Sequence, residues 1–518
     1  MNRLVASVLI SCSVLVITEA RAVEDKPLLA ISVTADFGAD RGQSFGTLFE
    51  ARDATGRVVA GAGFADVYNT RFRSDRQTVQ FFVRPAGDPA KMTVERLPHP
   101  DLDSGVYLLD IDQTLFAWSS VRGNSLRRWD AAAKRWHDQP PEGVTRLRSG
   151  DGVMRIGRGR LVFENNSATF NGQTILSPPQ RGDFYNYYYA AGRLFFYHTD
   201  RDAAAGFTRV LACPWTPESR GAIDLASATV LNAKYVGETP FAWGQLDGRV
   251  LTVSNNGGVY LFDPSESAWR VLREADRSVS YQVYSMMNFH DRQLLAQYPT
   301  GEVFEFNGRE LKHREGWPPR LPGVSGTSRE AQTLGVFGGD LLVGVWPWAE
   351  LWCYDRDATR WHSLGRAFTH PELTDSRTHP YEPESAKLGL VVNHWGQRVT
   401  GMVPLGDSLM ISTSSKGTDL WDAKYDFLTE PQRREYGAVL RLRAPGNLAA
   451  RIDWKDGPTR FDFVVHEGRM TIQQDGKLLA STPLDNVDLK SLVNAKVTPG
   501  TGIYGRFTGQ IRTTETTR

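Results

Sequence analysis

Cysteine is scarce in this sequence, and long hydrophobic runs are lacking after the N-terminal leader. Of the 3 cysteines, Cys213 and Cys353 are the two that lie beyond the first 22 residues. A chain of 518 residues can bury a core large enough to fold without disulfides, so we expect both thiols to be unpaired. No later stretch approaches the ~18 consecutive apolar residues of a membrane helix, and the sequence therefore predicts no stable membrane span.

An excess of charge of one sign is lacking as well. The chain has 60 basic and 59 acidic residues, and a near-neutral chain without a basic stripe argues against nucleic acid as a partner. The motif His-Glu-x-x-His, the Walker loop and the EF-hand loop do not occur. The sequence thus predicts no metal site and identifies no cofactor.

The N-terminus has the pattern of an export signal. Arg3 precedes an apolar run from Leu4 to Ile17, and Ala20-Arg21-Ala22 fits a small-x-small cleavage site. We expect residues 1–22 to be removed and the mature protein to be secreted or periplasmic. Leu9-Ile10-Ser11-Cys12 offers an alternative, because it resembles a lipobox that would make Cys12 a lipid anchor. The apolar run continues past Cys12, which favours the cleaved signal.

The remaining residues favour an all-β protein. The chain contains 48 Gly, 27 Pro and many aromatic residues, and short apolar runs alternate with Gly, Asp and Asn. In one repeat an aromatic residue precedes Asp, and Trp follows six positions later: Trp129-Asp130 with Trp136, Phe262-Asp263 with Trp269, and Tyr354-Asp355 with Trp361. This spacing predicts a hairpin whose Asp bonds turn amides and whose Trp packs between neighbouring sheets.

A second repeat, a turn followed by a short apolar strand, occurs seven times. Its central residues are Leu115, Leu161, Leu194, Leu251, Leu295, Leu342 and Leu409. Most intervals between them are near the ~40–50 residues of a four-stranded propeller blade. We therefore predict a β-propeller of about seven blades over residues 101–445, with Trp136, Trp269 and Trp361 at equivalent outer-strand positions.

In blade four, strands over residues 240–244, 249–254, 259–262 and 268–272 are expected to form the complete unit. This pattern resembles the blades of kelch-like secreted propellers, and the resemblance implies the architecture only. Residues 23–100 and 446–518 flank the propeller and alternate as strands do. The segment from Gly468 to Ser481, with its Asp475-Gly476 turn, resembles part of a lectin-type jelly roll. The two flanks could complete one domain together, or one of them could close the propeller ring.

Function is expected at the propeller face formed by the loops between second and third strands. These loops are predicted to carry aromatic, amide and hydroxyl side chains, which suit the apolar faces and hydroxyl groups of sugars: Trp118, Asn165, Asn166, His198, Asp200, Arg201, Asn255, Asn256, Tyr298, Trp346, Trp348, Ser414 and Lys416. An extracellular saccharide is therefore the predicted partner. The alternative for each position is ordinary packing or turn formation.

An insertion before blade seven, residues 365–398, is expected on the same face. It contains Tyr381, His394 and Trp395, and a long loop without secondary structure of its own is usually functional or disordered. We expect Tyr381 and Trp395 to bind ligand and His394 to take part in any chemistry.

Cleavage of the saccharide, by a polysaccharide lyase or a glycoside hydrolase, is the enzymatic version of this hypothesis. A lyase needs a base, an acid and a group that neutralises the uronic carboxylate. His198, Tyr187 and Arg201 are candidates from blade three, with packing in the core as the alternative for the tyrosine. The rival function is a non-catalytic scaffold for a protein partner, because propellers host many functions.

Overall fold

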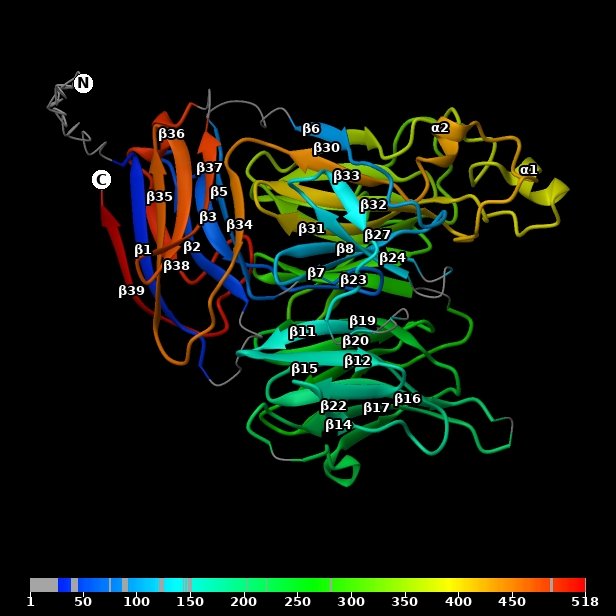
Figure 1. Ribbon diagram of the computed structural model, residues 1–518. Coiled ribbons are helices and arrows are strands. Elements are labelled where there is room, and N and C mark those ends of the chain that lie inside the picture. Colours follow the sequence, from blue (N-terminus) through cyan, green and yellow to red (C-terminus); the bar gives the residue numbers. More distant parts are fainter. Residues whose placement is uncertain are drawn as a thin grey trace, which may run out of the picture.

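The computed structural model describes residues 27–517 except 39–44, 74–75, 86–91, 120, 122–124, 143, 145–146, 148–150, 203, 220, 280–281 and 485–487. The predicted signal sequence and the alternative lipid-anchor residue Cys12 lie outside the described residues. Strands make up nearly all of the regular structure, and they form nine sheets. Figure 1 shows a two-sheet sandwich on the left, which contains the first and the last strand of the described chain, beside a larger ring of sheets.

The sandwich combines the two flanking segments. One five-stranded sheet has the order β37 (Lys477–Leu484), β36 (Gly468–Gln474), β35 (Thr459–His466), β1 (Leu29–Asp36) and β39 (Gln510–Thr517). The other has the order β34 (Asn447–Arg451), β5 (Thr78–Val83), β3 (Val58–Phe64), β2 (Gly46–Arg52) and β38 (Lys496–Pro499). The turn between β36 and β37 has positive φ at Asp475 (50°) and Gly476 (80°), as a tight hairpin requires.

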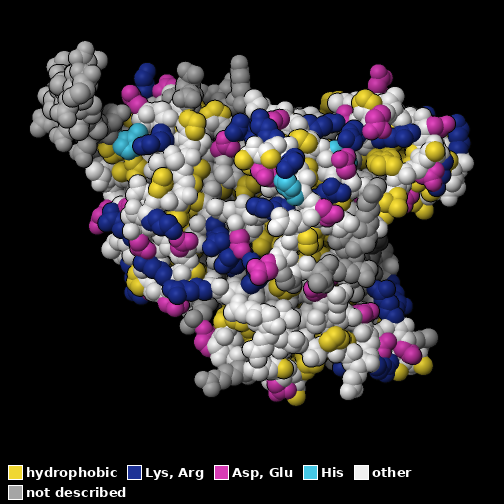
Figure 2. All heavy atoms as spheres, viewed as in Figure 1, with side chains coloured by type: hydrophobic (Ala, Val, Ile, Leu, Met, Phe, Trp, Pro, Cys, Tyr) yellow, Lys and Arg dark blue, Asp and Glu magenta, His cyan; other side chains and the backbone are white. Residues whose placement is uncertain are grey.

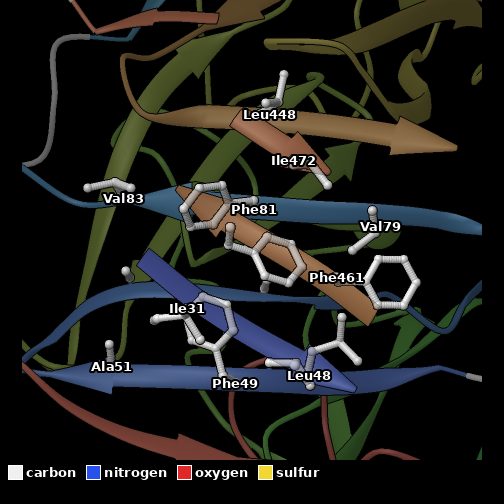
Figure 3. Close-up of a cluster of buried hydrophobic side chains, with 14 of the residues drawn as sticks. Ile31, Leu48, Phe49, Ala51, Val79, Phe81, Val83, Leu448, Phe461 and Ile472 are labelled. Atoms are coloured by element: carbon white, nitrogen blue, oxygen red, sulfur yellow. The ribbon is translucent and has the colours of Figure 1, made fainter. Parts of the chain in front are cut away.

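The sandwich core lies between the two sheets and draws on both ends of the chain. Ile31 of β1, Phe49 of β2 and Phe81 of β5 meet Phe461 and Ile472 of the C-terminal strands, and all five are at most 1% exposed (Figure 3). Each sheet contains strands from both flanks, so the two flanks bury one common core and form one sandwich.

The ring contains seven blades, each an antiparallel sheet. From the inner strand outward, blade one contains β7 (Tyr107–Ile111), β8 (Thr114–Ser119), β9 (Ser125–Asp130) and β10 (Arg135–His137), and blade two contains β11 (Gly152–Ile156), β12 (Gly159–Glu164), β13 (Ser167–Phe170) and β14 (Gln173–Leu176). Blade three contains β15 (Asp183–Ala190), β16 (Arg193–Asp200), β17 (Phe207–Pro214) and β18 (Thr229–Asn232). Blade four contains β19 (Pro240–Leu246), β20 (Arg249–Ser254), β21 (Val259–Asp263) and β22 (Ala268–Arg273).

Blades five and six contain β23 (Gln282–Phe289), β24 (Arg292–Tyr298), β25 (Val303–Phe306) and β26 (Leu311–Arg314); and β27 (Glu330–Phe337), β28 (Asp340–Trp346), β29 (Glu350–Asp355) and β30 (Arg360–Arg366). Blade seven contains β31 (Gln397–Leu405), β32 (Ser408–Ser415), β33 (Val439–Arg443) and, as its outer strand, β6 (Thr93–Arg96). Because β6 precedes blade one in sequence, the N-terminal flank closes the ring as well as contributing four of the ten sandwich strands.

The repeat that predicted the blades occupies equivalent positions. Trp136, Trp269 and Trp361 lie on the outer strands β10, β22 and β30, and each pairs with the aromatic residue that precedes the repeat's Asp. The Asp side chains accept hydrogen bonds from turn amides two and three residues later in the first and third repeats, at 2.9 to 3.1 Å. The all-β propeller fold and the three equivalent tryptophans are confirmed.

Cys213 and Cys353 are free and buried, on blades three and six, as predicted. No helix among the described residues is long and apolar enough to cross a membrane. Two short helices, α1 (Glu382–Lys387) and α2 (Glu430–Arg433), lie on the side of the propeller away from the sandwich (Figure 1). The insertion before blade seven therefore has some secondary structure of its own, contrary to our expectation, because Pro383 and the acidic first turn favour a helix start there. Basic and acidic side chains are interspersed over the face in Figure 2, in keeping with the balanced composition.

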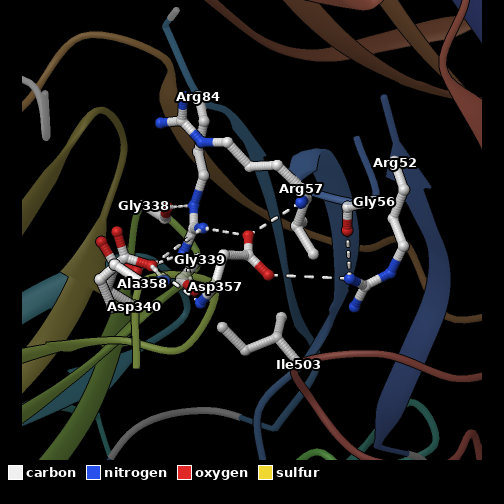
Figure 4. A network of polar contacts seen from close by, with 12 residues as sticks. Arg52, Gly56, Arg57, Arg84, Gly338, Gly339, Asp340, Asp357, Ala358 and Ile503 are labelled. Atoms are coloured by element: carbon white, nitrogen blue, oxygen red, sulfur yellow. Dashed lines mark hydrogen bonds and ion pairs between the residues drawn. The ribbon is translucent and has the colours of Figure 1, made fainter. Parts of the chain in front are cut away.

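A network of charges fixes the sandwich to blade six (Figure 4). Arg84, which follows β5, is an ion-pair partner of Asp340 and of Asp357, the latter at 3.0 Å, and it also donates to the carbonyl oxygens of Gly338 and Gly339. Asp357 also accepts from the amide of Val58 on β3 at 2.8 Å. Burial raises the pKa of Asp340 to about 7, and Arg84 opposes this rise.

Candidate functional site at the propeller axis

A segment of the N-terminal flank enters the centre of the ring. Within it, β4 (Val67–Asn69) pairs with the inner strand β23 of blade five. Farther along, the amide of Arg73 donates to Leu108 of β7 at 3.1 Å, and the amide of Asp110 donates back to Arg73 at 2.9 Å. Inner strands of a propeller leave one edge unpaired, and this inserted segment (residues 65–73, 76 and 77) satisfies part of two such edges.

Side chains of the inserted segment reach three further blades. The amide group of Asn69 donates to Gln332 of β27 at 3.1 Å, and that of Gln77 donates to Gly157 at 2.9 Å. The hydroxyl of Tyr68 bonds Asn186 of β15. Contacts with this many blades hold the segment at one position along the axis.

Arg71 follows β4 and carries a guanidinium group that has few partners. The group lies over the ring of Tyr284, 4.2 Å from its centroid, and 3.9 Å separates Nη1 from Oε1 of Glu330. Only 11% of the side chain is exposed. Burial opposes the charge of Arg71, but Glu330 and Tyr284 outweigh it and raise the pKa, so Arg71 is cationic.

Two more cations lie beside Arg71. Arg398, the second residue of β31, is 4% exposed, and Lys416, which follows β32, is half-buried. Nη1 of Arg398 donates to the backbone oxygen of Lys416 at 3.4 Å. We call these residues, with Glu330 and Tyr284, the axial cluster; it contains three cationic side chains and one carboxylate.

The electrostatics of the axial cluster are unbalanced. Arg398 and then burial lower the pKa of Lys416 to about 7. Burial and then Arg71 lower the pKa of Arg398 to about 10. Nη1 of Arg71 and Nε of Arg398 are buried without a hydrogen-bond partner among the described residues. A buried charged donor without a partner is costly, and a bound anion would remove that cost.

Aromatic side chains flank the cations. Nζ of Lys416 lies 5.7 Å from the ring centroid of Trp346, whose ring is 6.5 Å from that of Tyr298. Both residues end the second strands of their blades. Trp118 of β8 packs on Tyr107 at 4.9 Å, and Tyr107 is among the groups that act electrostatically on Arg71 and Arg398. The predicted residues Trp118, Tyr298 and Trp346 therefore lie around the axial cluster.

Other predicted residues lie apart from this cluster. His198 belongs to strand β16 rather than to the following loop, because its pairing with Phe184 and Arg209 extends the strand to Asp200. Its Nε2 is 2.8 Å from the oxygen of Arg181, and its ring lies between Phe184 and Phe207.

Tyr187 and Arg201 are the other two residues of the predicted blade-three triad. Tyr187 is buried and Arg201 is exposed. Tyr187 is 1% exposed and stacks on Phe163 at 4.5 Å, between blades two and three. Arg201 is exposed after β16. The structure thus does not bring the base, acid and neutralising group together around one point, and their catalytic role stays a prediction.

The aromatic residues of the insertion pack beneath it. Trp395 is fully buried and stacks on Trp421 at 5.8 Å, and Trp348 is 1% exposed and donates to Thr378. The hydroxyl of Tyr381 is 2.6 Å from Nδ1 of His370.

Two further predicted residues, His394 and Asn255, bond locally. His394 is buried, with Nε2 3.1 Å from Oδ2 of Asp419, and burial lowers its pKa although Asp419 opposes this. Asn255 follows β20, and its side chain accepts from the amide of Thr239 at 2.8 Å. No contact among the described residues joins His394 to His198.

The residues that make the axial cluster basic were missed by the sequence analysis, apart from Lys416. Arg71 belongs to the flank that we assigned outside the propeller, and Arg398 and Glu330 occupy inner-strand starts. The sequence offers one signal for Arg71, the alternation of charged and apolar residues in Arg71-Phe72-Arg73. An exposed edge strand has the same pattern, so this signal does not indicate a site at the propeller axis. In the part of the chain that the structure describes, no group of three or more His, Cys, Asp or Glu is placed to hold a metal ion.

No family model matches this chain, and no curated protein is similar to it in sequence. Solved structures similar to it include YCF48 bound to a D1 peptide (12% identity, 70% of this chain and 99% of that one, TM-score 0.37) and BamB from Moraxella catarrhalis (12%, 80% and 97%, 0.32). The β-propeller domain of Cps50 (Swd1) from Myceliophteria thermophila is a third (11%, 64% and 98%, 0.32). At these identities and TM-scores the similarity concerns the fold alone.

Proposed function

We propose that this protein, exported as its N-terminus predicts, binds an acidic saccharide at the axial cluster. The observation that carries the proposal is the imbalance of buried charge there. Arg71, Arg398 and Lys416 face one carboxylate, Glu330, and two of their donor nitrogens have no partner among the described residues. A carboxylate or sulfate group accepts such hydrogen bonds, and these charge-assisted bonds are the strong ones.

The aromatic residues favour a sugar as the carrier of that anionic group. Trp346 is 2% exposed and lies between Lys416 and Tyr298, so it supports the partly exposed ring of Tyr298. An anion bound by Lys416 would place the rest of its molecule near that ring, and sugar rings have apolar C–H faces that pack on aromatic rings. The proposal concerns binding; cleavage would need an acid and a base in addition.

Calorimetric titration with a galacturonate trisaccharide tests the proposal. Its fully methyl-esterified form is the matched control ligand, because it keeps the sugar and loses the charge. Arg398→Met is expected to weaken binding of the acidic form by about tenfold or more. Arg270→Met removes an arginine that is 51% exposed on blade four and should leave binding unchanged.

Equal affinity of the parent protein for the two ligands, or binding that Arg398→Met does not weaken, would contradict the proposal. Absorbance of an unsaturated product in the same samples tests cleavage separately.

A protein partner is the second candidate, favoured by one observation. Val391 and Val392 of the insertion are 67% and 54% exposed, and adjacent exposed apolar side chains are typical of contact surfaces. Replacing both valines with Asp should abolish capture of such a partner and leave trisaccharide binding unchanged.

A further inference from the structure

A second concavity lies between the sandwich and the propeller, near the turns that join inner to second strands. It has a volume of about 500 Å³. The sandwich side is formed by β2 and by the segment from Thr498 to Arg506, and the propeller side by turns of blades four, five and six. Junctions between domains are common places for ligand sites. We call this concavity the interface cleft.

Arginine is the main charged residue of the interface cleft. Arg52, Arg292, Arg356 and Arg506 line it, together with three carboxylates. Two of these carboxylates are already occupied by arginines of the cleft. Glu50 lies 2.5 Å from Arg52, and Asp291 lies 2.6 Å from Arg292.

The other two arginines supply the positive charge that is not used internally. Arg356 and Arg506 are exposed, and neither has an ion-pair partner among the described residues. Arg52 and Arg292 also have second carboxylate partners, in Asp357 at 3.7 Å and Glu305 at 3.2 Å. The positive charge that the cleft offers to a ligand is therefore that of Arg356 and Arg506.

His290 also lines the cleft, and nearby arginines affect its pKa. Burial, followed by Arg356 and Arg52, lowers its pKa to about 3. The imidazole is consequently neutral at neutral pH, and its ring nitrogens can donate one hydrogen bond and accept another.

The wall that holds Arg506 is closely packed. The amide of His290 donates to Ile503 at 3.0 Å, and the amide of Ile503 donates to Glu50 at 3.1 Å. A Cβ on Gly502 would approach Glu50 to 2.8 Å, and Gly505 has a φ of +86°. The left-handed backbone at Gly505 favours glycine, and a side chain at Gly502 would displace the carboxylate of Glu50 that accepts from Ile503. Both glycines therefore favour the packing of this segment against the propeller.

We infer that the interface cleft is a second anion site, which binds a sulfate or phosphate ester group. Arginine binds such tetrahedral oxyanions through its planar, forked donors. A volume of about 500 Å³ accommodates the sugar to which the ester is attached. The site is separate from the axial cluster, which is formed by other residues at the start of the inner strands, and the inference does not depend on the proposed function.

Calorimetric titration with glucose 6-sulfate and glucose 6-phosphate, with glucose as the uncharged control, tests the inference. The double variant Arg356→Met/Arg506→Met should weaken binding of at least one of the two esters by about tenfold or more, because each charge-assisted hydrogen bond contributes substantially. Comparing the two esters shows which group the cleft prefers. Both arginines are exposed, and circular dichroism of the double variant checks that the fold is retained.

Two further variants distinguish the two sites. Arg398→Met should leave the ester affinity of the cleft unchanged, and Arg270→Met serves as the surface control. Ester binding that is lost in Arg398→Met but retained in the double variant would overturn the inference. It would also be overturned if the parent protein binds neither ester more tightly than it binds glucose. Neither result bears on galacturonate binding at the axial cluster.

Discussion

Arg84 and Arg71 come from the same N-terminal flank and are both buried against the propeller, but carboxylates surround only Arg84. Asp340, Asp357 and Asp355 lie within 3.9 Å of Arg84, whereas Arg71 has Glu330 at 3.9 Å and shares its surroundings with two other cations. A charge that is matched locally holds the two parts of the molecule together. A charge that is not matched requires an anion from solution.

Burial alone therefore does not identify a functional arginine. Arg84 is 8% exposed and Arg71 11%, so the two would be ranked together by exposure. Their partners distinguish them: Arg84 also donates to two backbone oxygens, while Nη1 of Arg71 has no hydrogen-bond partner among the described residues.

The largest expected effect is the loss of the matched arginine. Arg84→Met should lower the free energy of unfolding by about 3–5 kcal/mol, because it leaves buried carboxylates without their cation. Urea denaturation followed by circular dichroism measures this change. Arg441→Met, which removes a partly exposed arginine of an ion pair on blade seven, is the control and should change stability by about 1 kcal/mol or less. A loss no larger than the control's would mean that Arg84 does not join the sandwich to the propeller.

Arg398, a second arginine of the axial cluster, should behave in the opposite way. Arg398→Met removes a buried cation that Arg71 and Lys416 repel, so the lost repulsion and the lost burial penalty offset the lost attraction to Glu330. We expect the free energy of unfolding to stay within about 1 kcal/mol of the parent value or to rise. A loss of stability comparable to that of Arg84→Met would show that the axial cluster is structural. It would also remove the contrast between the axial cluster and the ion pairs of Arg84.

The sequence predicts the propeller blades, because they depend on repeats. Trp136, Trp269 and Trp361 recur with one spacing because each blade needs the same hairpin, so the blade pattern is local and legible. The partners of Arg84 and Arg71 are set by contacts between segments hundreds of residues apart, such as Arg84 with Asp340 and Arg71 with Glu330. The spacing of residues within a repeat does not predict ion pairs between such distant segments.

The same reasoning explains the mixed outcome for the predicted site residues. Tyr298 and Trp346 end second strands and Trp118 is the penultimate residue of one, so the repeat locates all three at one face of the propeller, and their role in binding stays a prediction. Trp348 follows a second strand and Trp395 precedes an inner strand. Both pack against the insertion, and no repeat in the sequence predicts that packing.

The pH dependence of ligand affinity tests the charge of one residue of the axial cluster, Lys416. The pKa of Lys416 is lowered to about 7 by Arg398 and by burial, while Glu330, Arg71 and the nearby His379 are its other charged or titratable neighbours. An anion needs the ammonium form, so affinity for the galacturonate trisaccharide should be retained below pH 7 and fall as the pH rises above it. The fall should approach about tenfold per pH unit until the pKa of the liganded site is reached.

Lys416→Arg provides the control for this titration, because arginine keeps its charge across the range. Its binding should be independent of pH between 6 and about 8.5. A parent affinity that does not change over the same range would show that Lys416 is not part of the ligand site.

The smallest expected effect concerns the aromatic surface beside the cations. Tyr298 ends β24 and is partly exposed, with its ring 6.5 Å from Trp346. Tyr298→Leu keeps an apolar side chain but removes the flat ring, and aromatic packing of this kind contributes about 0.5–1.5 kcal/mol, or a roughly two- to twelvefold loss of affinity. The acidic trisaccharide and its methyl ester should lose affinity by the same factor, because stacking does not depend on the carboxylate. Arg398→Met should instead weaken the acidic form alone. If Tyr298→Leu also discriminates between the two ligands, Tyr298 acts on the charged group, and the division of the site into cations for the carboxylate and rings for the sugar is wrong.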